Sequence, residues 1–337
     1  MPRVATWFLA ICLCAPPMFS KEERTLQMYF IDVEGGQATL IVTPAGQSLL
    51  IDTGWAGFNA RDPDRIMAAA KMAGVRQLNY VLITHYHRDH VGGIAQLADR
   101  VKIGALVDHG PNQEDSDVAR ENYAAYQKVL GRAQHIVLHP GDGLPLTGVS
   151  MRVLTAAGEH IVDPLPGTGE VNPYCASEPA PADDPTENAR SLGVLLTYGK
   201  FRMIDLGDLT KKKELELVCP NNRVGKVDLY VVTHHGFAES NAKSIVWALH
   251  PRVAIMDNGP HKGGAPEAWQ VVHDSPGLQD LWQLHYALDP GQDHNVPDQF
   301  IANVDEKSDG NYIKVVAKSD GSFTVFNSRN KHKKQYD

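Results

Sequence analysis

Four side chains of metal-ligand type stand within six residues of the stretch YVLITHYHRDHVGGI. They are His85, His87, Asp89 and His90, and they follow an apolar run typical of a strand buried on both faces. His85 and His87 have the same parity and can face one metal ion, whereas Asp89 and His90 come where the chain turns and can reach a second ion. Imidazole nitrogen suits zinc, and carboxylate oxygen also suits iron or manganese. The spacing therefore predicts two divalent ions, with Zn2+ expected and Mn2+ or Fe as alternatives.

A purely structural use of these residues is the alternative. The chain contains 15 histidines, so two neighbouring histidines need no functional explanation. Four ligand types in this register after a buried strand are much harder to explain in that way. Gly92 and Gly93, which follow them, let the backbone pass close to an ion. We therefore interpret the motif as a metal site.

The segments around the motif alternate between strand and helix patterns. Apolar runs predict strands over 25–32, 37–43, 48–52, 78–85, 102–110, 134–141, 149–157, 190–199, 200–208, 227–236 and 251–259, and a hairpin over 311–327. Helix-forming residues predict helices over 64–74, 94–101, 118–131, 264–274 and 276–285. The Pro- and Gly-rich stretch 156–187 predicts a long loop that is either functional or disordered. These elements predict one α/β domain over 21–327, followed by a basic tail, 328–337, that we expect to be disordered.

The first twenty residues differ in character from the rest. Arg3 precedes the apolar run VATWFLAICLCA, two prolines follow, and the polar SKEER comes next. This layout predicts a secretory signal peptide over 1–20, too short to span a membrane, and hence a secreted or periplasmic protein. A short N-terminal core element is the alternative. Cys175 and Cys219 would remain after cleavage, either as one disulfide or as two free thiols.

The charge balance bears on the partners. The 337 residues carry a formal net charge of −8, from 32 basic and 40 acidic residues. A surface built to coat nucleic acid normally shows a basic face, so we expect no stable nucleic-acid complex. We also expect no membrane association, because no segment after residue 20 is apolar enough to cross a bilayer.

The motif HYHRDH, with LLIDTG some thirty residues before it, resembles the metallo-β-lactamase fold superfamily. The resemblance covers residues 26 to 325 and implies an αββα four-layer sandwich with a mono- or dinuclear metal site at one sheet edge. RMIDLGDL resembles the strand that ends in a metal-bridging aspartate, which is Asp208 here. VDLYVVTHHG resembles the late strand whose terminal histidine completes the second metal site.

Within the superfamily, DVEGGQA, NARS, LGD and HHGF resemble the metallo-domain of bacterial DNA-uptake channels and its secreted relatives. Three departures weaken a nuclease assignment. Gln37 stands where those relatives often have Asp, and Phe237 replaces a Ser after HHG. Conversely, this chain keeps His87 where the channel domains often carry Asp.

The resemblance implies a ligand set for each ion. The first ion would take His85, His87, Asp208 and, as a weak oxygen ligand, Asn188. The second would take Asp89, His90, Asp208 and one histidine of HHG. His234 directly ends the strand and is the predicted ligand, while His235 would lie behind the ligands or face the substrate.

Other polar residues are predicted to support this set. Asp52 of LLIDTG is expected to accept hydrogen bonds from ligand histidines and so fix their orientation, although a turn aspartate would have the same sequence. His109, His261 and Lys262 are candidates for substrate contact or leaving-group protonation, although each is equally typical of a surface loop. Asp89 and Asp208, which would hold the ions, are the predicted catalytic residues.

The predicted function is that of a secreted hydrolase using a metal-bound hydroxide, because two cations lower the pKa of a shared water. A phosphodiester or nucleic-acid substrate is slightly preferred through the uptake-channel resemblance. The first alternative is a hydrolase of a small neutral ester, lactone, lactam or halogenated compound. The second is a non-catalytic binding protein with the same fold.

Overall fold

Short apolar runs separated by Gly and Pro turns form the first sheet. The computed structural model describes residues 1–2, 24–176 and 181–337, so most of the signal peptide predicted for 1–20 lies outside the described residues. Nine strands form this sheet, in the order β17-β16-β15-β1-β2-β3-β4-β5-β6. Their bounds are β1 Leu26–Phe30, β2 Thr39–Val42, β3 Ser48–Ile51, β4 Leu78–Leu82, β5 Ile103–Asp108, β6 Gln134–Val137, β15 Ile313–Ala317, β16 Phe323–Asn327 and β17 Lys333–Tyr336. β1 to β3 form an antiparallel meander, and β3 to β6 run parallel.

The second sheet contains eight strands, in the order β14-β13-β12-β11-β10-β9-β7-β8. Their bounds are β7 Ser150–Ala156, β8 Glu159–His160, β9 Gly193–Tyr198, β10 Phe201–Asp205, β11 Leu229–Val231, β12 Val253–Met256, β13 Asp280–His285 and β14 Ile301–Asn303. β10 to β14 run parallel. The α-helices are α1 Arg61–Met72, α2 Arg88–Val91, α3 Ile94–Ala98, α4 Asp117–Leu130, α5 Lys211–Val218, α6 Lys243–Leu249 and α7 Pro266–His273.

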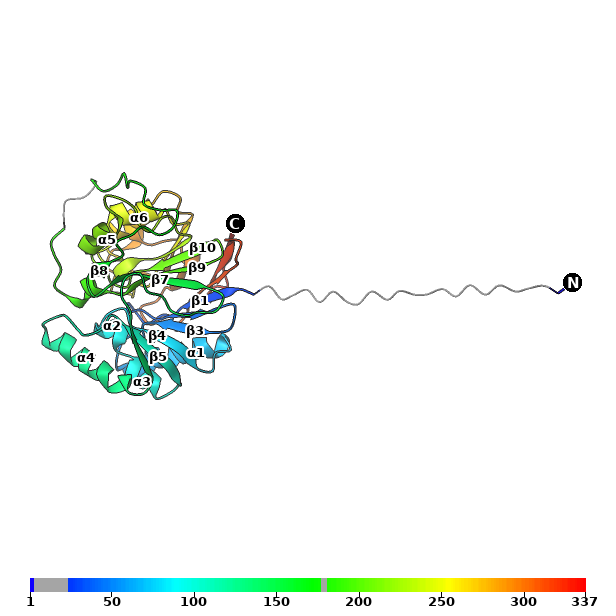
Figure 1. Ribbon diagram of the computed structural model, residues 1–337, viewed down its shortest axis with the longest axis horizontal. Coiled ribbons are helices and arrows are strands. Elements are labelled where there is room, and N and C mark those ends of the chain that lie inside the picture. Colours follow the sequence, from blue (N-terminus) through cyan, green and yellow to red (C-terminus); the bar gives the residue numbers. More distant parts are fainter. Residues whose placement is uncertain (3–23, 177–180) are drawn as a thin grey trace.

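Three apolar cores separate four layers. Side chains alternate along β1, so Met28 and Phe30 enter the core between the two sheets, while Tyr29 and Ile31 enter the core beneath the helices of the first sheet. A third core joins the second sheet to α5, α6 and α7. Figure 1 shows helices on both outer sides of the paired sheets. The predicted αββα sandwich is therefore confirmed.

The topology brings the chemical motifs to one edge of the sandwich. β4 ends just before the histidine motif, and it runs parallel to its neighbours β3 and β5. In the other sheet, the parallel strands β10 and β11 end just before Asp208 and the two histidines of HHG. Ligand sites of α/β sheets lie beyond the carboxyl ends of such strands. The two sheets thus contribute ligand residues from opposite sides.

The helix predicted for 276–285 is wrong, because this segment contains β13, which pairs with β12 and β14. Trp282 and Leu284 face the core between the sheets, and Leu281 faces the core beneath the helices. A strand buried on both faces has apolar residues at odd and even positions, and this pattern is easily taken for a helix.

The prediction of a disordered basic tail is also wrong. Lys333–Tyr336 is the edge strand β17, paired antiparallel with β16. Tyr336 is buried, stacks on Phe323 and accepts a hydrogen bond from Trp282 Nε1 at 3.0 Å. One aromatic anchor holds the strand in place, and the lysines beside it keep the sheet edge charged, which disfavours pairing with other chains.

Cys175 and Cys219 form a disulfide, with their Cα atoms 5.8 Å apart. The bond resolves the two alternatives that the sequence left open. It attaches the loop before Asn188 to the residue that follows α5, the helix after Asp208. Across the described ranges of the chain, no helix combines the length and apolar character needed to traverse a bilayer.

Candidate metal centre

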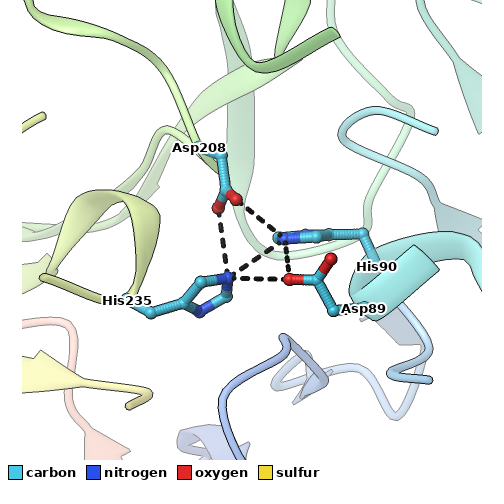
Figure 2. A group of neighbouring side chains, drawn as sticks. All are labelled: Asp89, His90, Asp208 and His235. Carbon is cyan, nitrogen blue, oxygen red and sulfur yellow. Dashed lines mark hydrogen bonds and ion pairs between the residues drawn. The ribbon is translucent and has the colours of Figure 1, made fainter. Parts of the chain in front are cut away.

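Four buried side chains converge from both sheets into one tight group, Asp89, His90, Asp208 and His235. Each offers one ligand atom, and these atoms all lie within 4.8 Å of one another (Figure 2). His90 Nε2 lies 3.1 Å from Asp208 Oδ2 and 3.1 Å from His235 Nε2. His235 Nε2 lies 3.2 Å from Asp89 Oδ2. Two imidazole nitrogens and two carboxylates at such distances are a donor set for zinc, iron or manganese.

Local backbone structure positions each member of the group. Asp89 and His90 lie on α2, a single helical turn that begins directly after His87. Asp208 lies in the turn that follows β10. His234 and His235 both have positive φ, 54° and 53°, a conformation that is costly for residues with a Cβ. Such strain persists only where the surrounding structure enforces it, which is typical of functional sites.

A second set of ligand atoms lies beside this group. His85 is fully buried, and its Nε2 lies 3.8 Å from Asp208 Oδ2. Among the described residues, His85 Nε2, Asn188 Oδ1 and Asp208 Oδ1 are buried without a hydrogen-bond partner. Buried polar atoms are rarely left without a partner, since this costs stability. These atoms fit a bound divalent ion, which would give each of them a partner.

His87, Asn188 and His234 surround the group at greater distance. His87 Nε2 lies 2.9 Å from Glu114 Oε2, and about a quarter of its side chain is exposed. Asn188 Nδ2 lies 3.3 Å from His234 Nε2, which lies 3.5 Å from Asp208 Oδ2. The structure therefore places His235 in the tight group and His234 on the side of Asn188. The backbone turn between the two histidines decides this arrangement.

Asp52 lies behind His90. Its Oδ2 is 2.7 Å from His90 Nδ1, and its Oδ1 accepts the backbone N–H of Thr84 at 2.8 Å. The carboxylate is fully buried and also accepts the Thr84 hydroxyl. Asp52 accepts the hydrogen bond from Nδ1–H, so neutral His90 would direct the lone pair of its Nε2 at the group.

The structure does not bring His109 or His261 into the group. His109 is buried, and its Nε2 lies 3.0 Å from Glu187 Oε2. His261 is exposed and pairs with Asp289 at 2.8 Å. Its neighbour Lys262 reaches the centre instead, donating a hydrogen bond to Asp89 Oδ2. From the sequence, Lys262 is only one of three loop residues that could contact the substrate or protonate the leaving group.

Sequence reasoning missed two acidic residues beside the centre. Glu187 is buried and accepts the backbone N–H of Gln113 at 2.7 Å. Glu114 accepts the backbone N–H of Glu187 at 2.9 Å and faces His87. The two carboxylates join the loop after β5 to the turn that carries Asn188. Nothing in the residue pattern marks them, because their partners are backbone groups far away in the sequence.

Burial and neighbouring charges shift the pKa values of the histidines in and beside the group. Burial opposes the charged form of His90, but the carboxylates of Asp208, Asp89 and Asp52 outweigh it and raise the pKa of His90 well above its usual value. Burial, reinforced by the charge of His90, holds the pKa of His85 well below its usual value. His85 is therefore neutral with a lone pair available. Metal ligands must be unprotonated, so metal binding here would displace protons and weaken in acid.

A buried carboxyl next to the centre provides a pH-dependent test. Burial raises the pKa of Asp205 to about 7, Asp257 and Asp52 add to the increase, and the Gly207 N–H opposes it. Because the folded-state pKa lies above the unfolded one, ionising Asp205 destabilises the fold as pH rises from about 4 to about 7. In metal-free protein, Asp205→Asn should raise the free energy of unfolding by roughly 3 kcal/mol more at pH 8 than at pH 4.5. Urea unfolding at both pH values measures this difference.

The exposed Asp99 offers the matched control. Asp99 pairs with Arg132 at the surface and is 69% exposed. Asp99→Asn should change stability by a similar small amount at both pH values. An Asp205→Asn gain that does not depend on pH, or a loss at pH 8, would contradict the expected ionisation cost.

Comparison with known proteins agrees with this geometry. Residues 31–176 match the family model described as Metallo-beta-lactamase superfamily. The chain is 26% identical over 250 residues to ComE operon protein 3 of Bacillus subtilis, an alignment covering 68% of this chain and 28% of that protein. It is 25% identical over 256 residues to Recombination protein 2 of Haemophilus influenzae, covering 75% of this chain and 27% of that protein.

A further relative has a length closer to that of this chain. The UPF0173 metal-dependent hydrolase H16_A2129 of Cupriavidus necator is 23% identical over 248 residues, which cover 71% of this chain and 77% of that protein. The chain spans only about a quarter of the length of the first two relatives. The family match, together with the αββα sandwich and the His/Asp group at its edge, shows that the chain carries a metallo-beta-lactamase superfamily domain.

Proposed function

We propose that this protein is a metal-dependent hydrolase that holds two divalent ions, preferably zinc, and cleaves phosphodiesters. The observation that carries the proposal is the buried group of Asp89, His90, Asp208 and His235 beside the unpaired Nε2 of His85. When bound, two such ions acidify water and polarise the oxygen under attack.

The geometry supports a specific division of ligands. Asp89, His90, Asp208 and His235 would hold the second ion, so His235 replaces His234 in the assignment made from sequence. Asp208 would belong to both ligand sets, because its Oδ2 lies 3.1 Å from His90 Nε2 and 3.8 Å from His85 Nε2, and its Oδ1 lies 3.4 Å from His235 Nε2. His85, His87 and Asp208 would hold the first ion, with Asn188 or His234 completing the set.

The remaining residues of the site hold the ligand residues in position. Asp52 holds His90 so that Nε2 remains a ligand atom, and Glu187 fixes the turn that carries Asn188. His87 would exchange its contact with Glu114 for the first ion. We include His87 because its ring lies 4.7 Å from that of His85.

One observation supports a phosphodiester substrate, and a second limits its length. Two of the relatives are named for the ComE operon and for recombination, which suggests substrates related to DNA. The net charge of −8 favours a short substrate over a long polyanion. A neutral ester or thioester is the second candidate, because a 108-residue stretch is 28% identical to a hydroxyacylglutathione hydrolase of Rhodopseudomonas palustris.

We further propose that the protein acts in an oxidising compartment outside the cytoplasm. The Cys175–Cys219 disulfide supports this, since such bonds persist mainly in secreted and periplasmic proteins. The signal peptide predicted for residues 1–20 agrees with it. Fractionation of cells producing the full chain should recover the protein outside the cytoplasm with a shortened N-terminus.

A substrate panel with metal analysis tests the proposed activity. Protein loaded separately with zinc, manganese or iron is assayed on bis(p-nitrophenyl) phosphate, p-nitrophenyl acetate, S-lactoylglutathione and nitrocefin. We expect about two ions per chain and the highest kcat/KM on the phosphodiester. Faster thioester or ester cleavage would favour the second candidate. Fewer than one ion per chain without any activity would indicate a binding protein.

A further inference from the structure

Lys262 extends from the loop after β12 into the metal centre. Its Nζ donates hydrogen bonds to the Gly35 carbonyl, at 2.6 Å, and to Asp89 Oδ2. An ammonium group has three N–H donors, so these two contacts leave one for another acceptor. About a quarter of the side chain is exposed. A positive charge with a remaining donor therefore lies at the solvent side of the centre.

Aromatic rings flank this ammonium group. Lys262 Nζ lies 5.2 Å from the ring centroid of Trp55 and 5.7 Å from that of Phe237. The ring of Phe58 meets that of Trp55 edge-on, with the centroids 6.4 Å apart. Phe58 itself is 61% exposed. We call Lys262, Trp55, Phe58 and Phe237 the cation–aromatic patch.

Backbone strain indicates that the exposure of Phe58 is maintained by the fold. Gly57, Phe58, Asn59 and Ala60 all have positive φ, from 46° to 89°, although only the first lacks a side chain. The segment is fixed at both ends by Asp62, whose carboxylate accepts the Trp55 N–H at 2.8 Å and pairs with Arg61. The strained turn holds the Phe58 ring beneath the Arg61 guanidinium, 4.6 Å from the ring centroid, and leaves most of the side chain exposed. Strain of this kind concentrates at ligand-binding sites.

We propose that the cation–aromatic patch binds a phosphodiester that carries a flat ring, which is the chemistry of a nucleotide ester. Lys262 would pair with the phosphoryl group beside the ions, and the rings would stack on the base. The inference rests on the proposed hydrolase function and deepens it by naming the substrate class. The proposal also assigns a role to Phe237, which follows HHG in this chain where the related motif has Ser.

The test compares three substrates that share one leaving group. Thymidine 5′-(p-nitrophenyl phosphate) has the anion and the base, methyl p-nitrophenyl phosphate has only the anion, and p-nitrophenyl acetate has neither. In zinc-loaded Lys262→Met, KM should rise about tenfold for both phosphodiesters and stay within about twofold for the acetate. In Phe58→Ala, KM should rise about fivefold for the thymidine ester alone.

Lys314 provides the matched control. It also lies over an aromatic ring, 4.7 Å from the centroid of Tyr29, but on β15. Lys314→Met should leave all three KM values unchanged, and Lys262→Arg should recover part of the loss. Equal losses on the acetate, or a zinc content reduced in Lys262→Met, would overturn the proposal, because Lys262 would then act by holding Asp89.

Binding measurements separate failure of this inference from failure of the hydrolase proposal. If wild-type protein cleaves none of the three substrates, the hydrolase proposal is wrong. Calorimetry of thymidine 5′-monophosphate and of thymidine with zinc-loaded protein then tests whether the patch binds nucleotides. A Kd about tenfold lower for the nucleotide, lost in Lys262→Met, would support the patch. Equal affinities for nucleotide and nucleoside would overturn it. If wild-type protein cleaves only the acetate, the inference about the patch is wrong, but the protein is still a hydrolase.

Discussion

Replacing Asp208 with alanine is expected to lower kcat/KM by roughly 1,000-fold or more and to remove at least one metal ion per chain, since losing even an outer partner of a ligand costs 10–100-fold. Asp208 lies beside both ligand sets, with its Oδ2 3.1 Å from His90 Nε2 and 3.8 Å from His85 Nε2. Asp89 Oδ2 also lies 3.2 Å from His90 and 3.2 Å from His235, so the loss in Asp208→Ala should come mainly from the ion beside His85. Metal content per chain and steady-state rates on bis(p-nitrophenyl) phosphate measure the effect.

Asp228 offers a control for the loss of a largely buried aspartate. It lies just before β11 in the same sheet and pairs with Arg252 at 3.0 Å, away from the metal group. Asp228→Ala should lose some stability but keep both ions and its activity. His87→Ala, which affects the first ion only, should also abolish turnover. Retained activity in purified Asp208→Ala protein with full metal content would disprove the bridging role.

The local half of the site could be predicted because it is encoded in consecutive residues. A buried strand followed by His85, His87, Asp89 and His90 is recognisable from apolar periodicity and ligand spacing alone. The convergence of Asp208 with these residues could not be derived from spacing, because it depends on how two sheets pack. Resemblance to a fold superfamily supplied that step, and the structure places Asp208 beside the early motif.

The sequence alone could not predict details that depend on backbone conformation. His234 and His235 are identical residues, and only the left-handed turn at both positions decides which ring enters the tight group. Glu187 and Glu114 act through backbone N–H groups of distant loops, so no pattern in their own segments marks them. Lys262 gains its importance from the position of Asp89 rather than from its neighbours in the chain.

The two errors in the fold have a common cause in tertiary packing. Residues 280–285 have apolar side chains at positions that suit a helix, yet burial between β12 and β14 selects a strand. Residues 333–336 are mostly polar, yet the burial of Tyr336 between Phe323 and Trp282 orders them. In both segments, long-range contacts outweigh local preference.

Asp52→Asn is expected to weaken zinc binding roughly 10–100-fold at the site that includes His90. Asparagine matches aspartate in size and tolerates the positive φ of 59° at this position. Its amide, however, offers only one acceptor oxygen. The backbone N–H of Thr84 needs that oxygen, so the amide N–H₂ must face His90 Nδ1. His90 would then carry its proton on Nε2, where a metal ligand needs a lone pair.

Competition with a zinc-binding indicator at pH 7.5 measures this affinity, and Asp108→Asn is the matched control. Asp108 is also a buried aspartate beside a histidine, with its Oδ2 2.8 Å from His135 Nε2, but neither residue belongs to the tight group. Asp108→Asn should leave zinc affinity within about twofold of wild type. Unchanged zinc affinity in Asp52→Asn would show that Asp52 does not control the His90 tautomer. Because both variants replace a buried aspartate that pairs with a histidine ring, a loss confined to Asp52→Asn would identify its pairing with His90 as part of the metal centre.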